Sequence, residues 1–422
     1  EGWIAGIKLA TLSLDTGTSN AELIAALASS DVDVTEYLAD EVFSHQPPAI
    51  QAFLLQTSIL DHFCAALCDA VIQEGANDDW EGGDWSAATC IEWLVRANLF
   101  MTALDGRREW YRYHHLFRDM LRRRAAGALA AEQQCRLQQR AAQWFAQRSL
   151  FDEALRHALA AGDLELVDRV IEAGLPGALN REDWQTIERW LRMLPTALVE
   201  TRPWLLLVKA LTLQYTWQLG AQVRVLDQID ALLDLTGVDP SAGDMPPGSN
   251  LQPDSQPDSQ SGTSGARLRA FVALMRGQHA FYSNQPLRAL ELLATVMPRL
   301  PESWTYVRGA TMLYIGVSMQ TAGQGAAAER LLLDCFERYE KKADPFGLRL
   351  LMPLCFNYFA QGRLEQVRQT AATMLRLCTN QPLATMQSWG HYFLGLAHFE
   401  WNQLPAAKAH FAAVAERRHV AT

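Results

Sequence analysis

The chain has 422 residues, with 37 Lys and Arg against 47 Asp and Glu, so its formal net charge is −10 at pH 7. Neutralisation of phosphates by Lys and Arg supplies most non-specific affinity for nucleic acids, so this charge argues against nucleic-acid binding over the whole surface. The length allows two or three domains with ample core, and the hydrophobic content of 49% is ordinary for a globular protein.

Several functional classes lack their sequence signals. Lys8 interrupts a short apolar run at the N-terminus, and no small-residue cleavage site follows, so we expect neither a signal peptide nor a membrane anchor. The seven cysteines include no C-x-x-C pair, which favours free thiols in a reducing compartment. No Walker A, G-x-S-x-G or H-E-x-x-H motif occurs, so we expect this chain not to be an enzyme by itself.

The first third predicts helices followed by a β-hairpin and a further helix. Apolar periodicity places the first helices at about 36–45, 47–57, 61–73 and 86–98. Two strand-like runs, at 99–104 and 110–113, flank Asp105-Gly106, a typical hairpin turn in which glycine accepts positive φ. A helical pattern begins at His114. This order is typical of a winged-helix domain.

From about residue 130 the predicted helices come in pairs. They lie at 133–148, 151–161, 163–173 and 182–194. Asp163 is expected to cap the third helix, and the segment 174–177, with Pro176, is expected to break it. Trp184 belongs to an apolar stripe on the fourth helix, which predicts a core position.

Beyond Pro203 the sequence predicts repeated helical hairpins. Turns are expected near Gly220, Gln285, Gln324, Gly362 and Gln403, and the last four are 39, 38 and 41 residues apart. This period is tetratricopeptide-like, and stacked hairpins leave a concave surface. The interval from 220 to 285 is too long, and its excess, residues 236–265, has the composition of a disordered insertion.

One motif resembles a known family. Tyr113-His114-His115-Leu116-Phe117-Arg118-Asp119-Met120 resembles the Met-His-Asp motif that closes the winged-helix domain of STAND-class NTPases, and more specifically that of MalT-like, ATP-dependent LuxR-family transcription regulators. Further similar segments follow in order between residue 1 and about 240, at 1–10, 37–42, 53–60, 96–100 and 157–163.

The resemblance implies a mainly α chain, a winged-helix domain with a small β-hairpin followed by a right-handed, tetratricopeptide-like solenoid of helical hairpins. Its implied parts are a remnant of an NTPase module at 1–30, a winged-helix domain at 31–128, helical linker repeats at 129–202 and a sensor domain at 203–422.

The resemblance also assigns a role to the histidine pair. In the resembled families the central histidine of the motif faces the β-phosphate of ADP, and the matching residue here is His114. His115 replaces the usual aspartate. Sensing of ADP by His114 would need an NTPase module, which this chain lacks. The alternative is that His114 is a capping or packed residue at a strand-to-helix junction.

Aromatic residues on the first helices of the repeats are candidates for an effector site. Tyr282, Tyr314, Tyr358 and Trp401 are expected at such positions. Aromatic rings that stack on a flat face suit a sugar-like ligand. The alternative is that these rings pack between helices.

Two charged stretches each allow two interpretations. The run Arg122-Arg123-Arg124 could contact DNA, or it could form a solvated face or interdomain contacts. The acidic loop at 76–86 could hold a cation, although its spacing does not fit an EF-hand, or it could be a solvated loop.

The resulting hypothesis is the regulatory, effector-sensing middle of a cytoplasmic, signal-responsive transcriptional activator. No cofactor is expected in this chain, whereas ATP or ADP would bind the implied full-length protein. The expected partners are an inducer or an inhibitory protein on the concave repeat surface, an NTPase module in cis, and a further copy of the parent; no membrane is involved. DNA would be bound only through a C-terminal helix-turn-helix that is not in this sequence. The alternative is a free-standing scaffold that binds proteins, with neither ATPase nor DNA-binding activity.

Overall fold

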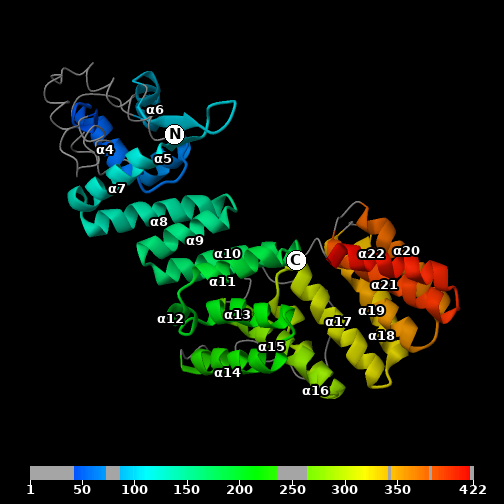
Figure 1. Ribbon diagram of the computed structural model, residues 1–422. Coiled ribbons are helices and arrows are strands. Elements are labelled where there is room, and N and C mark those ends of the chain that lie inside the picture. Colours follow the sequence, from blue (N-terminus) through cyan, green and yellow to red (C-terminus); the bar gives the residue numbers. More distant parts are fainter. Residues whose placement is uncertain are drawn as a thin grey trace, which may run out of the picture. The chain divides into compact units, whose positions relative to one another are not determined.

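The computed structural model describes residues 42–72, 86–97, 99–235, 264–340, 344–379 and 383–418. The chain divides into two compact units, residues 1–170 and 171–422 (Figure 1). The expected NTPase remnant, the acidic loop up to residue 85 and the insertion up to residue 263 lie outside the described residues. The domain boundaries expected from the sequence therefore remain predictions.

The first unit has the expected order of helices, hairpin and helices. Its described elements are α4 (Pro48–Thr57), α5 (Ala65–Ile72), α6 (Ala87–Arg96), β1 (Met101–Ala103), β2 (Tyr111–Tyr113), α7 (His115–Ala128), α8 (Ala131–Gln147) and α9 (Phe151–Ala161). The helix expected to begin at residue 61 begins only at Ala65. Phe63, two residues before this helix, forms an antiparallel bridge with Tyr111 and so extends the hairpin.

The hairpin turn differs from the prediction. The strands pair antiparallel with Met101 opposite Tyr113, but the loop is longer than two residues. Positive φ occurs at Arg108, at 55°, and not at Gly106. The Asp105 carboxylate accepts hydrogen bonds from the backbone N–H groups of Glu109 and Trp110, at 2.9 and 3.2 Å. The turn is therefore held by an aspartate side chain, because such a side chain can bond to nearby backbone in place of a backbone acceptor.

The hairpin is anchored in the core of the first unit by Tyr113. Its ring lies 4.5 Å from the ring of Phe63, and its hydroxyl lies 2.8 Å from Oγ1 of Thr57. Tyr113 is 3% exposed, and burial raises its pKa well above the ordinary value. The hydroxyl therefore stays neutral and satisfies a buried threonine, which fixes β2 against α4.

The second unit begins within α10 (Leu164–Asn180). Asp163 caps this helix as expected, since its carboxylate accepts the N–H of Leu166 at 2.9 Å. The break expected at 174–177 is wrong, because Pro176 lies inside the helix. The neighbouring Leu175 and Leu179 are fully buried, and burial of such side chains outweighs the loss of one backbone hydrogen bond.

The rest of the second unit is a series of antiparallel helices (Figure 1). The elements are α11 (Trp184–Met193), α12 (Thr196–Val199), α13 (Pro203–Tyr215), α14 (Leu219–Leu235), α15 (Ser264–Tyr282), α16 (Pro286–Ala294), the 3₁₀ turn η1 (Met297–Arg299), α17 (Thr305–Thr321), α18 (Gly325–Glu340), α19 (Pro345–Ala360), α20 (Leu364–Cys378), α21 (Ala384–Glu400) and α22 (Leu404–Arg418). The insertion was expected to end at residue 265, but α15 already begins at Ser264, two residues earlier than expected.

The repeat is visible in the backbone of the hairpin turns. Each described turn between paired helices has one residue with φ between 57° and 79°: Trp217, Asn284, Gly323, Gly362 and Asn402. The last four are 39, 39 and 40 residues apart, which confirms the expected period. Glycine and asparagine adopt this conformation at lower cost than other residues.

Small residues allow close contact within the pairs. A Cβ atom at Gly277 of α15 would lie 2.7 Å from Cγ of Leu293 of α16, and a Cβ atom at Gly316 of α17 would lie 3.1 Å from Leu332 of α18. The expected fold class, a mainly helical chain with a small β-hairpin and a solenoid of helical hairpins, is thus confirmed. Among the described helices, none has the length and apolar character needed to cross a bilayer.

Candidate functional site

The strand-to-helix junction places the two histidines side by side. His114 precedes the first residue of α7, and its backbone N–H donates to the carbonyl of Phe100 at 2.7 Å. The imidazole rings of His114 and His115 lie 4.3 Å apart. The His114 side chain accepts no hydrogen bond from the first turn of α7, so it is not a side-chain cap. Imidazole N–H groups at a helix N-terminus can donate to an anion, and ADP sensing by His114 stays a prediction.

The carboxylate of Asp61 contacts two arginines of α7, the helix that follows the histidines. Asp61 contacts Arg118 at 3.2 Å and Arg122 at 3.0 Å, and Arg156 of α9 at 2.7 Å. Partial burial opposes ionisation of Asp61, but the hydrogen bond from Arg122 and the charges of the three arginines outweigh it and lower its pKa. The carboxylate thus joins the segment before α5 to α7 and α9.

The arginine run on α7 is engaged within its own unit. Arg122 also donates to the carbonyls of Ser58 and Ile59, at 2.9 and 3.2 Å. The guanidinium of Arg124 lies 4.6 Å from the ring centre of Phe43. These contacts favour the structural interpretation of this run over a DNA-binding patch.

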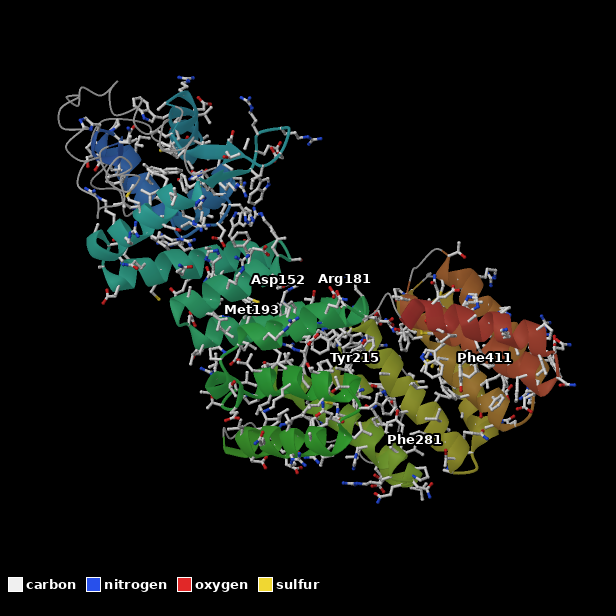
Figure 2. The ribbon with its side chains drawn as sticks, in the orientation of Figure 1. Asp152, Arg181, Met193, Tyr215, Phe281 and Phe411 are labelled. Carbon is white, nitrogen blue, oxygen red and sulfur yellow. The ribbon has the colours of Figure 1, made fainter. Side chains whose placement is uncertain are left out.

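The second unit brings aromatic residues from several helices together. We call the following residues the aromatic cluster: Trp184, Tyr215, Trp217, Phe281, Tyr282, Tyr306 and Tyr314. Figure 2 labels two of them, Tyr215 at the end of α13 and Phe281 near the end of α15. Three members expose a large part of their surface, namely Trp217 (69%), Tyr215 (44%) and Tyr282 (42%).

Two of the predicted ligand residues form the centre of this cluster. The hydroxyls of Tyr282 and Tyr314 lie 3.0 Å apart, and their rings meet edge to face at 6.0 Å. The Trp217 ring lies 5.7 Å from Tyr282. Trp217, the positive-φ residue of the turn after α13, thus contacts a residue of α15 while most of its surface stays exposed.

A second group of rings adjoins the first. Trp184 of α11 stacks on Tyr215 with centroids 4.9 Å apart and planes 16° from parallel, and it meets Tyr306 edge to face at 5.8 Å. Tyr306 lies on α17, the helix that also carries Tyr314 of the first group. The cluster therefore continues from α11 and α13 to α15 and α17.

Two tyrosines of the cluster, Tyr306 and Tyr314, stay neutral at ordinary pH. Burial, followed by the neighbouring Glu182, raises the pKa of Tyr306, while Arg349 opposes this. Burial and the neighbouring Tyr282 raise the pKa of Tyr314 well above its ordinary value. The hydroxyls can therefore donate or accept hydrogen bonds without bringing charge, which suits a neutral ligand with both hydroxyl groups and apolar faces.

The other two predicted ligand residues make their contacts elsewhere. Tyr358 is only 6% exposed, and the guanidinium of Arg363 lies 4.6 Å from its ring centre. Burial and the adjacent Glu329 raise the pKa of Tyr358 to about 12. Trp401 ends α21, and its ring lies 6.0 Å from that of His398. The structure thus joins Tyr282 to Tyr314, but brings neither Tyr358 nor Trp401 into ring contact with them.

Five members of the cluster were not predicted from the sequence as ligand residues: Trp184, Tyr215, Trp217, Phe281 and Tyr306. Trp184 was expected in the core, but it is only partly buried, whereas Ile187 and Trp190 of the same helix are buried. The signal for Trp217 was its place beside a predicted turn, where a large apolar residue has no helix partner. Tyr215 and Tyr306 carried no distinguishing pattern.

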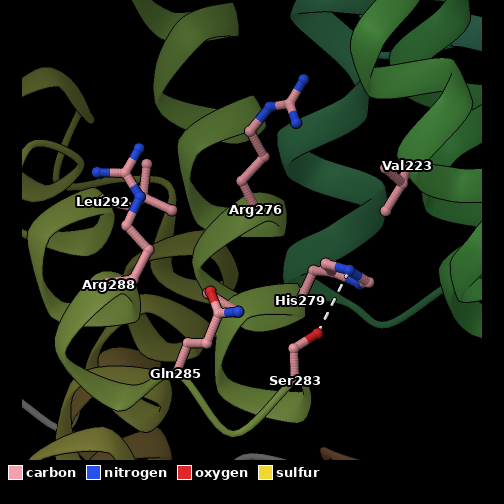
Figure 3. A pocket seen from close by; sticks show the side chains of 8 residues that line it. Val223, Arg276, His279, Ser283, Gln285, Arg288 and Leu292 are labelled. Carbon is pink, nitrogen blue, oxygen red and sulfur yellow. Dashed lines mark hydrogen bonds between the residues drawn. The ribbon is translucent and has the colours of Figure 1, made fainter.

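A small cavity of about 290 Å³ lies between α14, α15 and α16 (Figure 3). Its polar lining includes Arg276, His279, Ser283 and Arg288. Both arginines already have acidic partners, since Arg276 contacts Asp227 and Asp230, and Arg288 contacts Glu291. The cavity therefore offers no uncompensated positive charge to an anion. Among the described residues, no three His, Cys, Asp or Glu side chains are grouped to hold a metal ion.

Comparisons with known proteins agree with this architecture. The family of MalT winged helix domains matches residues 39–134. The serine/threonine-protein kinase PknK of Mycobacterium tuberculosis is 28% identical over 202 residues, and so is PknK of Mycobacterium bovis. The match covers 48% of this chain and 17% of the kinase, so this chain corresponds to a small part of those relatives.

A solved structure has a similar fold. It is a STAND protein (signal transduction ATPase with numerous domains) with a tetratricopeptide repeat sensor, from Pyrococcus horikoshii. The TM-score is 0.58 at 14% sequence identity, and the match covers 94% of this chain and 56% of that one. Together with the motif at the strand-to-helix junction and the period of the hairpins, these matches identify residues 39–134 as a MalT winged-helix domain, which a helical-repeat solenoid follows.

Proposed function

We propose that this chain is the effector-sensing, regulatory part of a signal-responsive transcriptional activator. The aromatic cluster is the observation that carries the proposal, with the Tyr282 and Tyr314 hydroxyls 3.0 Å apart beside the exposed ring of Trp217. A MalT winged-helix domain and a solenoid in one chain support a regulatory sensor region. The effector binds the repeats, and the winged-helix domain couples the nucleotide state to that event.

The chemistry of the cluster favours a neutral, sugar-like effector. Exposed aromatic faces stack on the apolar C–H faces of a pyranose ring, and tyrosine hydroxyls bond to its hydroxyl groups. An anionic effector is disfavoured, because Arg349, the cation beside Tyr306, is already paired with Glu182. An inhibitory protein that covers the same surface would compete with such an effector.

The nucleotide part of the proposal requires domains outside this sequence. ATP or ADP binds an NTPase module in cis, and His114 contacts the ADP phosphate in the closed state. DNA is bound by a helix-turn-helix elsewhere in the longer, cytoplasmic protein. Self-association of that protein on activation belongs to the same proposal.

The effector site can be tested on the chain itself. Isothermal titration with neutral oligosaccharides of two to four pyranose units should reveal at least one ligand, and Trp217→Leu should weaken its binding ten-fold or more. The matched control is Trp93→Leu, because Trp93 is also an exposed tryptophan (40%) but lies on α6 of the other unit. Equal affinities of the Trp217→Leu variant and the parent chain would contradict the proposed site.

The nucleotide role is tested in the longer protein that carries the NTPase module. His114→Ala should weaken ADP binding and raise effector-independent activation of transcription. His115→Ala is the matched control, since its ring lies beside His114 but is not the matching residue of the motif. Unchanged ADP affinity and unchanged basal activation in His114→Ala would refute the role.

The alternative function is a free-standing scaffold for protein binding. The observation that favours it is an apolar groove of about 500 Å³ on the last hairpin, lined by Phe399, Leu404 and Phe411 among others. Figure 2 labels Phe411 on α22. A scaffold would bind no oligosaccharide, and the chain would capture a partner that Leu404→Glu releases. A ligand that binds the aromatic cluster and is unaffected by Leu404→Glu would favour the sensor.

A further inference from the structure

The turn between α10 and α11 contacts three successive repeats. It consists of residues 181–183, with Glu182 at φ 58°, and Figure 2 labels Arg181 within it. Side chains and carbonyls of residues 180 and 182 bond to α17, α19 and α21, the first helices of three consecutive hairpins. A single short segment therefore fixes repeats that lie far from it in the sequence.

Asn180 caps α17. Its side-chain oxygen accepts the N–H of Tyr306 at 2.9 Å, and its side-chain nitrogen donates to the carbonyl of Ser303 at 2.7 Å. The N-cap residue of α17, Trp304, supplies no side-chain cap of its own. The backbone N–H groups in the first turn of a helix have no partner within that helix. In α17, Asn180 of α10 accepts one of them.

Glu182 joins α19 to α21. Its carboxylate forms an ion pair with Arg349, and both side chains are nearly buried, at 5% and 6% exposure. The other carboxylate oxygen accepts the N–H of Thr385, in the first turn of α21, at 3.1 Å. The same arginine donates to the carbonyl of Asn180 at 3.1 Å. Loss of Glu182 would leave a buried cation without its partner, which is strongly destabilising.

The packing of α17 is adapted to this ion pair. A Cβ atom at Gly309 would lie 2.6 Å from Cδ and 2.8 Å from Cβ of Arg349, so only glycine leaves room for the arginine to cross α17. Nε of Arg349 is buried and has no hydrogen-bond partner among the described residues.

Tyr306 connects this arrangement to the aromatic cluster. The Arg349 guanidinium lies 5.0 Å from the ring centre of Tyr306, and that ring also meets Trp184. Trp184 follows Glu182 by two residues and stacks on Tyr215. A ligand that displaces Trp184 or Tyr306 would therefore move groups that contact Glu182 and Arg349.

We infer that residues 180–182 hold α17, α19 and α21 in one arrangement, and we call these residues the latch. A ligand bound to the aromatic cluster weakens or strengthens the contacts of the latch with these helices. The role of a ligand in this inference rests on the proposed effector function. The contacts of residues 180–182 with the three helices do not depend on a ligand. An effector that binds one arrangement of these helices better than another would shift the sensor toward that arrangement.

Hydrogen exchange of the whole chain, followed by mass spectrometry, tests the latch without a ligand. Glu182→Gln should accelerate exchange at least ten-fold in residues 383–390 and 303–310, while circular dichroism keeps its helical amplitude. The matched control is Glu172→Gln, because Glu172 lies on α10, the helix that leads into the turn, and pairs with Arg267 of α15, at 16% and 20% exposure. That variant should accelerate exchange near residues 264–270 and leave residues 383–390 unchanged. Unchanged exchange at 383–390 in Glu182→Gln, or equal acceleration there in both variants, would overturn the latch.

A milder variant keeps the test informative if Glu182→Gln does not fold. Gly309→Ala crowds Arg349 without removing a charge, so it should accelerate exchange at residues 383–390 several-fold. Gly316→Ala is its control on the same helix, since its added Cβ would approach Leu332 and Pro353 instead. Equal effects of the two substitutions on residues 383–390 would count against the latch.

The connection to the cluster is tested with and without ligand. Trp184→Leu should change exchange at residues 383–390 at least three-fold, and a saturating neutral oligosaccharide should do the same in the unaltered chain. If the chain binds no oligosaccharide but Glu182→Gln and Trp184→Leu still change exchange at residues 383–390, the proposed effector is refuted and the latch is supported. A chain that binds the oligosaccharide with no change at residues 383–390 would keep the effector site and refute the role of the latch in sensing.

Discussion

His157 stacks on Phe145, with ring centroids 5.4 Å apart and planes 7° from parallel. Nδ1 of the imidazole lies 2.6 Å from Oε1 of Gln138, so the contact joins α9 to two positions of α8. Burial and then the charge of Arg156 lower the pKa of His157 to about 4. The imidazole is therefore neutral in the folded first unit at neutral pH, and a protonated ring is disfavoured between Phe145 and the nearby arginines.

Acidification should destabilise the first unit through His157. Its pKa is depressed on folding, so the unfolded chain takes up the proton first, and stability is lost as pH falls from the ordinary value near 6.5 toward 4. Between pH 7 and pH 5 the loss should be about 2 kcal/mol. The measurement is urea unfolding monitored by hydrogen exchange in α8 and α9. In His157→Gln, which keeps a hydrogen-bonding side chain but does not titrate, this part of the pH dependence should vanish. If it persists, another group is responsible.

Asp61→Asn should destabilise the first unit by about 1 kcal/mol. The substitution removes the carboxylate that three arginines share, and 43% exposure of Asp61 limits the effect through solvent screening. Glu92→Gln is the matched control, because it breaks a single, more exposed pair with Arg96 and should change stability by under about 0.5 kcal/mol. Since the pKa of Asp61 is lowered, its contribution should fade as pH drops through that pKa, and equal stabilities of the two variants at neutral pH would contradict the assignment.

The winged-helix order and the repeat period were predictable, because both follow from local patterns. Strand-like runs, the apolar period after His114 and evenly spaced turns depend on neighbours within about forty residues. The continuation of α10 through Pro176 was not predictable, since it depends on the burial of Leu175 and Leu179 against other segments. The positive φ at Arg108 was likewise not predictable, because the turn is held by the carboxylate of Asp105. The Asp105-Gly106 dipeptide predicts a two-residue turn with positive φ at the glycine instead.

The candidate site was predictable only in part. Tyr282 and Tyr314 could be selected because repeated hairpins place equivalent positions on one surface. Trp184 comes from a helix outside the repeats, and its periodicity indicates a core stripe rather than a partly exposed ring. The contact between Glu182 and Arg349 joins residues 167 positions apart, and no local pattern in the sequence carries such a contact.

Gly277→Ala should destabilise the second unit by about 1 kcal/mol. The new methyl group would overlap the fully buried Leu293, and overpacking costs about 1–3 kcal/mol, against a helix-propensity gain of about 1 kcal/mol. Gly220→Ala in α14 is the control, since nothing lies within 4 Å of its added Cβ, and it should be neutral or stabilising by up to about 1 kcal/mol. Denaturant unfolding of both variants decides the matter. Equal stabilisation by the two substitutions would mean that α15 and α16 can separate without cost.

The last hairpin should loosen in acid because of its histidines. Nδ1 of His391 on α21 lies 3.0 Å from Nδ1 of His410 on α22, so one nitrogen must donate and the other accept. Partial burial and the charge of His398, whose ring stacks on His410 at 5.5 Å, lower the pKa of His410. The neutral form is thus favoured in the folded hairpin, and its stability falls as pH drops below the ordinary histidine value.

Exchange of the α22 amides, corrected for intrinsic rates, should therefore be several-fold faster at pH 5.5 than at pH 7.5. His410→Asn keeps a polar side chain that does not titrate, so it should remove most of this difference. Lys408→Gln alters the charge of the same helix without touching the imidazoles and should leave the difference intact. If the acid response survives in His410→Asn or disappears in Lys408→Gln, the net charge of α22 governs the hairpin rather than the shared proton, because only the histidine pair requires one neutral acceptor at 3.0 Å.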